Sequence, residues 1–385
     1  MRATALRIAM LAAMTAAVLS AAHIGLAAVD TATATEQPAA GYCTVDAAPI
    51  DSSTLRRLYA GPPQTWPAPC RLPGVEWSEL AALPAAPPSP DARSMTRDEV
   101  ALGRRLFHDP RLSRSGQIAC ASCHDQDLGW ADGRRVSFGH DRTPSRRNAP
   151  SVRYAAYADS LFWDGSAGSL EEQAMAPIMH AGEMAFDADG FRQRLLTLDD
   201  YSATARALYA RERLQPGDVA SALATFQRSL ATPRGRYQAF MKGRKQAFSD
   251  EALLGLHLFR TKAGCMNCHH GASFSDGRFH NLGISFYGSE RQDVGRYAVT
   301  GRSEDVGAFR TPSLLGVGET SPYMHAGHFR DLRTVLLMYR VGMPQPKPRG
   351  QQAEDVLFPK SSPLLMPIDL QENEIQALEA FLRTL

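Results

Sequence analysis

The chain has 385 residues, which is enough for two domains, and with 44% hydrophobic and 21% charged residues its composition is that of a globular protein. Its 42 basic and 40 acidic side chains leave a formal net charge of +2. This balance, without any block of Lys or Arg, argues against a nucleic-acid-binding protein and against a protein that binds anionic membranes.

The first 28 residues have the pattern of a secretory signal peptide. A short basic stretch precedes an Ala/Leu/Met-rich run over residues 8–19, and small residues follow it. We expect cleavage near Ala22 or Ala27 and export to the periplasm. An uncleaved N-terminal anchor is the alternative, and only then would the protein contact a membrane, although the run is marginal for a span.

Residues 29–95 are rich in Pro, Ala and Ser, which predicts an extended arm with one short helix at 53–59. The arm contains Cys43 and Cys70. In an oxidising compartment we expect these two cysteines to pair, which is worth about 3–4 kcal/mol in the chain-entropy model. Two unpaired thiols are the alternative.

From Thr96 onwards the pattern becomes helical. Thr96-Arg-Asp-Glu99 has the form of a capping box before an apolar periodic run. Further helices are predicted at 218–230, 252–259, 333–339 and 371–385, and Ser249-Asp-Glu251 opens the second of these. The first helix and the one at 252–259 share a Leu-Gly pair followed by Leu-Phe. This weak internal repeat predicts two related domains, 96–245 and 246–385.

Each of these two helices leads into the pentapeptide C-x-x-C-H, the attachment sequence of c-type haem. Two thiols add across the haem vinyl groups, and the adjacent His binds the iron as its proximal ligand. A zinc or thioredoxin-type site is the alternative for C-x-x-C, but both copies carry the His. The sequence therefore predicts two covalently bound haems. Their attachment residues are Cys120, Cys123 and His124 for the first haem, and Cys265, Cys268 and His269 for the second.

Several further segments, in this order, resemble the bacterial di-haem cytochrome c peroxidases and the related MauG-type enzymes. The segments are LFHDPRLS at 106–113, RNAPS at 147–151, FWDG at 162–165, LEEQA at 170–174, EM at 183–184, FRTPSL at 309–314 and PYMH at 322–325. The resemblance covers about residue 98 to the end. It implies an all-α fold of two cytochrome c-like haem domains packed around a shared junction, with 29–95 as an irregular N-terminal arm.

The resemblance also assigns catalytic roles. The haem held by His124 would bind hydrogen peroxide, and Glu183 would take a proton from peroxide and return it to the leaving oxygen. Gln173 would be a second distal polar group. Taken alone, Glu183 would instead be a solvated loop acid. Trp163 would lie between the haems, where it could pass electrons or simply pack the core.

The distal ligands of the two irons stay open at this point. His140 aligns with the His that blocks the first haem in many resting peroxidases, and a surface His is the alternative. For the second haem the ligand position falls on Tyr339, as in MauG-type enzymes. Met338 and Met343 are close enough to present a sulfur instead, as in other peroxidases. Tyr339 could also be a packing residue, which would leave the iron without a side-chain ligand.

Asn148, with the backbone carbonyls of Thr320 and Pro322, matches the inter-haem calcium site of the family. All three groups are hard oxygen ligands, which calcium prefers. We therefore expect one calcium ion in addition to the two haems.

Three functions compete. The first is a peroxidase that reduces hydrogen peroxide to water with electrons from a small cytochrome c or cupredoxin, entering through the second haem. The second is a MauG-like oxidase that uses peroxide to oxidise a residue of a partner protein. The third, an electron-transfer cytochrome, would not need Gln173 and Glu183. His140 favours the first and Tyr339 the second, and we predict the first.

Overall fold

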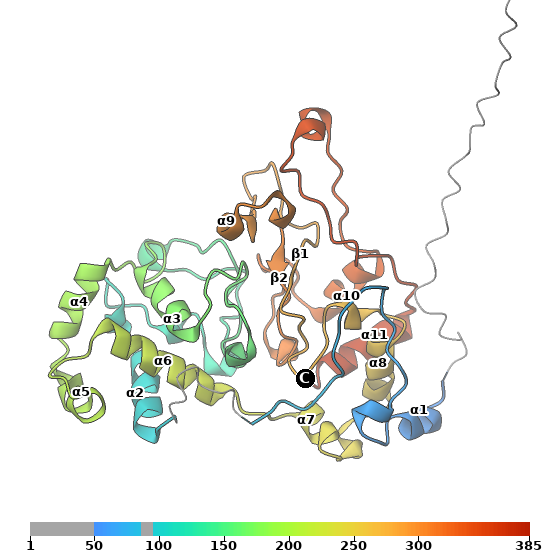
Figure 1. Ribbon diagram of the computed structural model, residues 1–385, viewed down its shortest axis with the longest axis horizontal. Helices are drawn as coiled ribbons and strands as arrows, with labels where there is room; N and C mark the ends of the chain where they lie inside the picture. The colour runs from blue at the N-terminus through green and yellow to red at the C-terminus, as the bar shows by residue number, and fades with distance from the viewer. Residues whose placement is uncertain (1–49, 86–94) are drawn as a thin grey trace, which may run out of the picture. The chain divides into compact units, whose positions relative to one another are not determined.

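The computed structural model describes residues 50–85 and 95–385, which all belong to one compact unit (Figure 1). The predicted signal segment and Cys43 lie outside the described residues. The helices are α1 (Ser52–Leu58), α2 (Arg97–Phe107), α3 (Leu170–Met179), α4 (Ala188–Leu196), α5 (Ser202–Tyr209), α6 (Pro216–Leu230), α7 (Arg236–Met241), α8 (Asp250–Arg260), α9 (Tyr297–Thr300), α10 (Leu332–Arg340) and α11 (Glu372–Leu382). No helix in this part of the chain is long and apolar enough to cross a bilayer.

The predicted all-α class is confirmed. The β-structure of the described residues is limited to one short antiparallel pair and isolated bridges. In that pair, β1 (Phe279–His280) lies beside β2 (Phe309–Arg310), with Phe279 opposite Arg310. Long irregular segments and short 3-10 turns connect the helices and carry most of the residues considered below.

The predicted helix starts also hold. The Thr96 hydroxyl accepts a hydrogen bond from the Glu99 amide at the start of α2, and the Ser249 hydroxyl accepts one from the Ala252 amide at the start of α8. Each cap satisfies a backbone N–H that has no partner inside the helix, typically worth about 1 kcal/mol. Both helices therefore begin close to where the sequence places them.

In the first core, α2 crosses α6 at a close approach that requires a glycine. A Cβ at Gly103 would overlap the carbonyl oxygen of Ala222 on α6. Phe107 and Phe226 then pack together, with ring centroids 5.1 Å apart, among the buried side chains of both helices. The crossing holds the end of α2 against α6 just before the first C-x-x-C-H motif.

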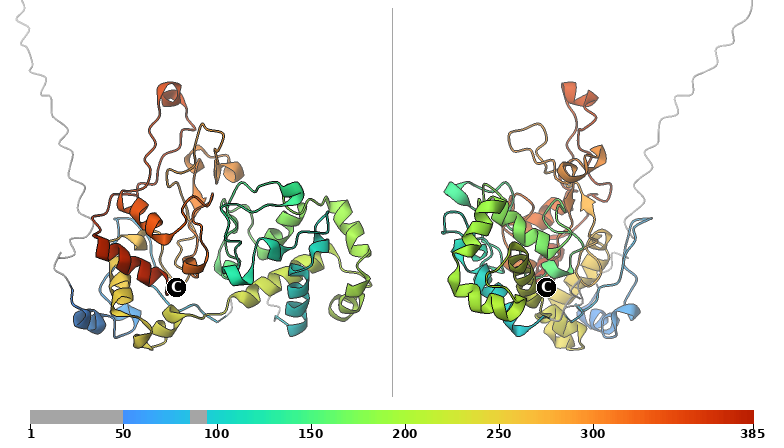
Figure 2. Two further views of the ribbon diagram at one scale, coloured as in Figure 1. Left: turned by 180° about the vertical axis from the view of Figure 1, so that it is seen from behind. Right: turned by 60° about the vertical axis from the view of Figure 1, so that its left-hand side comes forward.

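The second core repeats this arrangement. A Cβ at Gly255 on α8 would overlap the carbonyl oxygen of Ala377 on α11, and the rings of Phe259 and Phe381 lie 5.2 Å apart. In the left view of Figure 2, dark red α11 lies against yellow α8. The Leu-Gly and Leu-Phe repeat of the sequence therefore corresponds to one helix crossing built twice. The domain boundary between 245 and 246 stays a prediction.

The arm is irregular, as expected, but its described residues 50–85 are packed against the second core. The Tyr59 hydroxyl lies 3.0 Å from His257 Nδ1, and the Leu72 amide donates to the Asn267 side chain inside the second haem motif. Arg260 is fully buried and pairs with Glu79 at 2.6 Å. The arm also contributes Cys70, which is disulfide-bonded. The segment is therefore part of the second core.

Candidate active site

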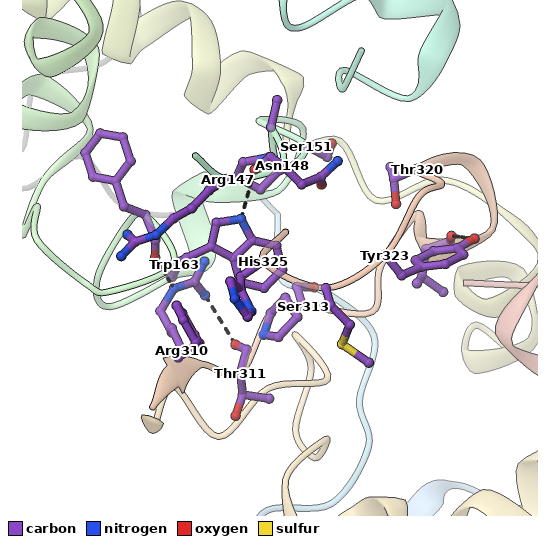
Figure 3. A pocket seen from close by; sticks show the side chains of 18 of the residues that line it. Arg147, Asn148, Ser151, Trp163, Arg310, Thr311, Ser313, Thr320, Tyr323 and His325 are labelled. Atoms are coloured by element: carbon purple, nitrogen blue, oxygen red, sulfur yellow. Dashed lines mark hydrogen bonds between the residues drawn. The ribbon is translucent and has the colours of Figure 1, made fainter. Parts of the chain in front are cut away.

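Both C-x-x-C-H motifs open onto one continuous cavity of about 1050 Å³. Its wall includes all six predicted attachment residues, together with Gln173, Glu183 and Tyr339. Glu183 lies near Cys123 of the first motif, and Tyr339 lies near Cys265 and Cys268 of the second. Figure 3 shows part of the pocket wall, where Arg147, Asn148, Trp163, Arg310 and His325 are among the labelled side chains. The cavity therefore brings together the two haem motifs and most of the residues that the sequence suggested for catalysis.

The first motif presents its His in a defined tautomer. The chain turns through a 3-10 helix at Cys120–Ser122, and the His124 amide donates back to the Cys120 carbonyl. His124 Nδ1 lies 3.1 Å from the Trp130 carbonyl, which can only accept, so Nδ1 carries the proton and Nε2 is free to bind a metal. Burial lowers the pKa of His124, which keeps the imidazole neutral.

The second motif has the same design. Its 3-10 helix spans Cys265–Asn267, and His269 Nδ1 lies 2.8 Å from the Phe274 carbonyl. Burial lowers the pKa of His269 as well. Each imidazole is therefore oriented by a backbone carbonyl and keeps a lone pair on Nε2, as an iron ligand requires.

The motif thiols suit covalent attachment of haem. All four are free, and burial raises the pKa of Cys120 and of Cys265 to about 12. Cys268 also lies near Asp276 and His280, a grouping that could hold a metal ion. His280 Nε2 already bonds to the Asp276 carboxylate at 2.8 Å, and a thioether to haem would use the sulfur. This group is therefore explained without a separate metal.

Glu183 lies on the wall beside the first motif. After α3 the chain folds back, because the Met184 amide donates to the Pro177 carbonyl and the Glu183 amide donates to the His180 carbonyl. Burial raises the pKa of Glu183, which favours a carboxyl group that can carry a proton. Its backbone is packed tightly, since a Cβ at Gly139 would overlap the Gly182 carbonyl oxygen and the Glu183 Cα.

His140 occupies the loop packed on Glu183, but its side chain is not among the residues that line the cavity. Its amide donates to the Glu183 carbonyl at 2.8 Å, and its Nε2 lies 3.5 Å from the exposed Asp141 carboxylate. Asp141 itself has a φ of 52°, in the left-handed region. In this conformation His140 contributes its backbone to the position of Glu183.

Of the three residues suggested as ligand to the second iron, only Tyr339 lines the cavity. It projects from α10 towards the second motif. Burial raises the pKa of Tyr339, and the nearby sulfurs of Cys268 and Cys265 raise it further. Met338 and Met343 do not line the cavity, although Met343 is buried elsewhere. The helix therefore presents the phenol, not a sulfur, to the second motif.

Trp163 lines the cavity that both motifs share, and two other segments of the chain bind its polar groups (Figure 3). Its indole N–H donates to the Asn148 carbonyl at 2.9 Å, and its own carbonyl accepts from the Arg310 amide at 2.8 Å. The ring packs edge-on to His325 with centroids 6.5 Å apart. Trp163 is therefore packed in the cavity wall, and its position between the haems stays a prediction.

Two arginines on the cavity wall were quoted within the motifs but given no role by sequence reasoning. Arg147 pairs with Asp164 at 2.6 Å and with Asp293 at 2.7 Å. Arg310 donates to the carbonyls of Phe162 and Thr311 but has no carboxylate partner within the described ranges. Burial lowers the pKa of Arg310. A half-buried cation that forms no ion pair, although the charge of Asp159 acts on it, fits a cavity that receives the propionates of haem.

The residues expected to hold calcium also share this wall. Asn148 is buried, and its Nδ2 donates to the Arg134 carbonyl at 2.9 Å, so its Oδ1 remains available as a ligand. The carbonyls of Thr320 and Pro322 accept no hydrogen bond from the residues that the structure describes. These three oxygens are hard ligands left without a hydrogen-bond donor on the cavity wall, and the calcium site stays a prediction.

The fold and the cavity define a protein of the c-type cytochrome class with two haem-attachment sites. The family model of the di-haem cytochrome c peroxidases matches residues 97–246. The methylamine utilization protein MauG of Methylorubrum extorquens is 36% identical, over 80% of this chain and 85% of that protein. The cytochrome-c peroxidase IdrP1 of Denitromonas iodatirespirans is 35% identical, over 81% of this chain and 87% of that protein.

Among solved structures, a MauG-like protein associated with microbial copper homeostasis matches with a TM-score of 0.69 and 30% identity, over 80% of this chain and 95% of that one. The di-haem peroxidase BthA of Burkholderia thailandensis shares the fold, with a TM-score of 0.65 at 24% identity. The chain therefore belongs to the di-haem cytochrome c peroxidase and MauG family. Members carry two haem c groups and are oxidoreductases that act on peroxide.

Proposed function

We propose that this protein is a periplasmic peroxidase that reduces hydrogen peroxide to water, with electrons that a small cytochrome c or cupredoxin delivers through the second haem. The observation that carries the proposal is the position of Gln173 and Glu183 on the cavity wall beside the first motif. An electron carrier has no use for a proton-transfer group at that place. The balanced reaction takes up two electrons and two protons for each peroxide and releases two waters.

The first haem would be held by Cys120, Cys123 and His124, and the second by Cys265, Cys268 and His269. Bound haem supplies the redox-active iron that takes up the peroxide oxygen and exchanges electrons. Arg310 would offset propionate charge, because it is a half-buried guanidinium on this wall that forms no ion pair among the described residues. The neutral, oriented imidazoles of His124 and His269 would bind the irons through Nε2.

Glu183 would move the proton. In its carboxylate form Oε would accept a proton from one peroxide oxygen, and in its acid form it would return that proton to the other oxygen, which leaves as water. Its raised pKa favours this exchange near neutral pH. Gln173 would orient the peroxide through hydrogen bonds, because an amide does not exchange protons readily at this pH.

The placement of His140 outside the cavity lining favours a first site that is open to peroxide in the resting enzyme. Trp163 would assist electron passage between the haems. Asn148, Thr320 and Pro322 would hold a calcium ion that stiffens the junction. Chelation of calcium, checked by metal analysis, should slow electron passage from the second haem to the first, and an unchanged rate in calcium-free enzyme would remove the ion from the proposal.

A MauG-like oxidase is the second candidate, and the placement of Tyr339 favours it. The resemblance gives MauG-type enzymes a Tyr at this position, and here the phenol and neither sulfur lines the cavity. Such an enzyme would remove the two electrons from a residue of a partner protein and pass them to peroxide. The two candidates therefore differ in what supplies the electrons.

Steady-state peroxide consumption with a reduced cytochrome c or cupredoxin tests the proposal. We expect sustained turnover in which each peroxide oxidises two equivalents of donor. Rapid reaction with one peroxide, followed by negligible turnover with every small donor tried, would favour the MauG-like candidate. A fully haem-loaded protein that does not react with peroxide at all would contradict both.

A further inference from the structure

Gln227 is a second buried amide on the cavity wall, and neither the sequence motifs nor the comparisons give it a role. It lies on α6, lines the cavity and is 4% exposed. Its Nε2 donates to Gln173 Oε1 at 3.1 Å. Its own Oε1 is buried and has no hydrogen-bond partner among the described residues. Because burying an unpaired amide oxygen is costly, this oxygen calls for a partner in the cavity.

The contact between the two helices does not depend on Gln227. The neighbouring residue, Arg228, is 6% exposed and pairs with Glu171 on α3 at 2.8 Å. This half-buried ion pair joins the same two helices, one residue from Gln227 along α6 and two residues from Gln173 along α3. The amide of Gln227 is therefore not required to hold α3 against α6. Its unpaired oxygen is instead available to bind a molecule in the cavity.

We propose that Gln227 is a positioning residue of the peroxide site. By donating to Gln173 Oε1, it fixes the Gln173 side chain so that Nε2 is left as a donor. That nitrogen makes no hydrogen bond within the described part of the chain. Gln227 Oε1 adds an acceptor beside it. Hydrogen peroxide both donates and accepts hydrogen bonds, so the amide pair complements it.

This inference rests on the proposed function of the cavity, because it names how that site orients its substrate. The pair would hold peroxide in one orientation relative to Glu183 while leaving proton transfer to the carboxyl group. Orientation of a reacting group matters steeply, because small displacements of a bound substrate cost large factors in rate. The two glutamines are 54 residues apart in sequence and lie on different helices, so only the fold brings them together.

The first experiment is Gln227→Leu, followed by stopped-flow mixing of the haem-loaded enzyme with peroxide. We expect both haems to be retained, the peroxide step to slow about tenfold, and oxidation of the donor to stay unchanged. The control is Gln238→Leu. Gln238 is also a buried glutamine, but it lies on α7, accepts from the Leu83 amide at 3.1 Å and does not line the cavity. It should leave the peroxide step unchanged.

A spectroscopic measurement separates positioning from a general loss of structure. Cyanide bound to the first haem of the ferric enzyme should change its C–N stretching frequency in Gln227→Leu and in Gln173→Leu, but not in Gln238→Leu. A frequency identical to that of the wild type in Gln227→Leu would overturn the proposal, because the donor facing the ligand would then be undisturbed.

A double-mutant cycle completes the test. If Gln227 acts by holding Gln173, the double variant should be within about twofold of Gln173→Leu alone in the peroxide step. Effects that simply multiply would overturn the positioning role, as would a wild-type rate in Gln227→Leu. If the wild-type holoenzyme does not react with peroxide, the proposed function is wrong. If it reacts at a rate that does not depend on Gln227, only this inference is wrong.

Discussion

The two haem-attachment regions are alike in how they are built and different in what faces them. Each uses a glycine at a close helix crossing, a phenylalanine pair about 5 Å apart and a proximal His oriented by a backbone carbonyl. The wall near the first motif carries Gln173 and Glu183, whereas the wall near the second carries the phenol of Tyr339. The repeated scaffold therefore accounts for two haem-attachment sites, and the unlike walls are the basis of the division of labour that we propose for the two haems.

The largest effect should come from removing either haem. Cys265→Ser/Cys268→Ser should lose one covalent haem, detected by mass and haem staining, and should abolish turnover with a reduced donor. Cys120→Ser/Cys123→Ser should do the same. If either protein kept two covalent haems, the assignment of the motifs would be wrong.

Glu183→Gln changes only the wall near the first motif and leaves the second haem site as it is. The substitution is nearly isosteric, so both haems and the fold should be retained, while the loss of proton transfer should slow the peroxide step by about 10²–10⁴. Oxidation of the donor should not change. The step is followed by stopped-flow absorption, and a rate within about twofold of the wild type would remove Glu183 from the mechanism.

Alanine at the crossing glycines tests the shared scaffold. Gly103→Ala and Gly255→Ala each place a Cβ against a backbone carbonyl of the facing helix, and overpacking of this kind costs about 1–3 kcal/mol. Both variants should melt at lower temperature. Gly217→Ala is the matched control, because a Cβ there meets no other atom within 4 Å. Equal melting temperatures for all three variants would show that the crossings are not tight.

A smaller effect concerns acid stability of the first core. Although burial raises the pKa of Asp109, hydrogen bonds from Arg111 and Tyr201 hold it below its usual value. A carboxyl whose pKa is lowered on folding stabilises the protein above its unfolded pKa, and this stabilisation is lost as the pH falls through the folded value. Tyr201→Phe should cost about 1 kcal/mol at pH 7 and less at pH 3. Denaturant midpoints at the two pH values measure this, and an equal loss at both would contradict the assignment.

The sequence predicts the elements whose signals are local. The caps at Thr96 and Ser249 and the apolar periodicity locate α2, α6, α8, α10 and α11 to within a few residues. The short helices α4, α5 and α7 were not assigned. The packing of residues 50–85 on the second core could not be predicted either, because it depends on contacts with residues almost 200 positions away, such as that of Tyr59 with His257.

The candidate site, too, could be predicted from the sequence only where its signals are local. The haem motifs are contiguous, so the sequence identifies them directly. The choice among Tyr339, Met338 and Met343 depends on the rotation of α10, because successive residues point about 100° apart around a helix. The roles of Gln227 and Arg310 depend on neighbours from other elements, the former on Gln173 and the latter on Phe162. Each is a single polar residue without a motif that would reveal its partner.

The most direct test of the division of labour is stopped-flow mixing of the two single-haem proteins with one equivalent of peroxide. The protein that lacks the second haem, Cys265→Ser/Cys268→Ser, should still show a fast peroxide-consuming phase, because Gln173 and Glu183 remain beside the first haem. The protein that lacks the first haem, Cys120→Ser/Cys123→Ser, should lose that phase. A fast phase that survives without the first haem and disappears without the second would contradict the account.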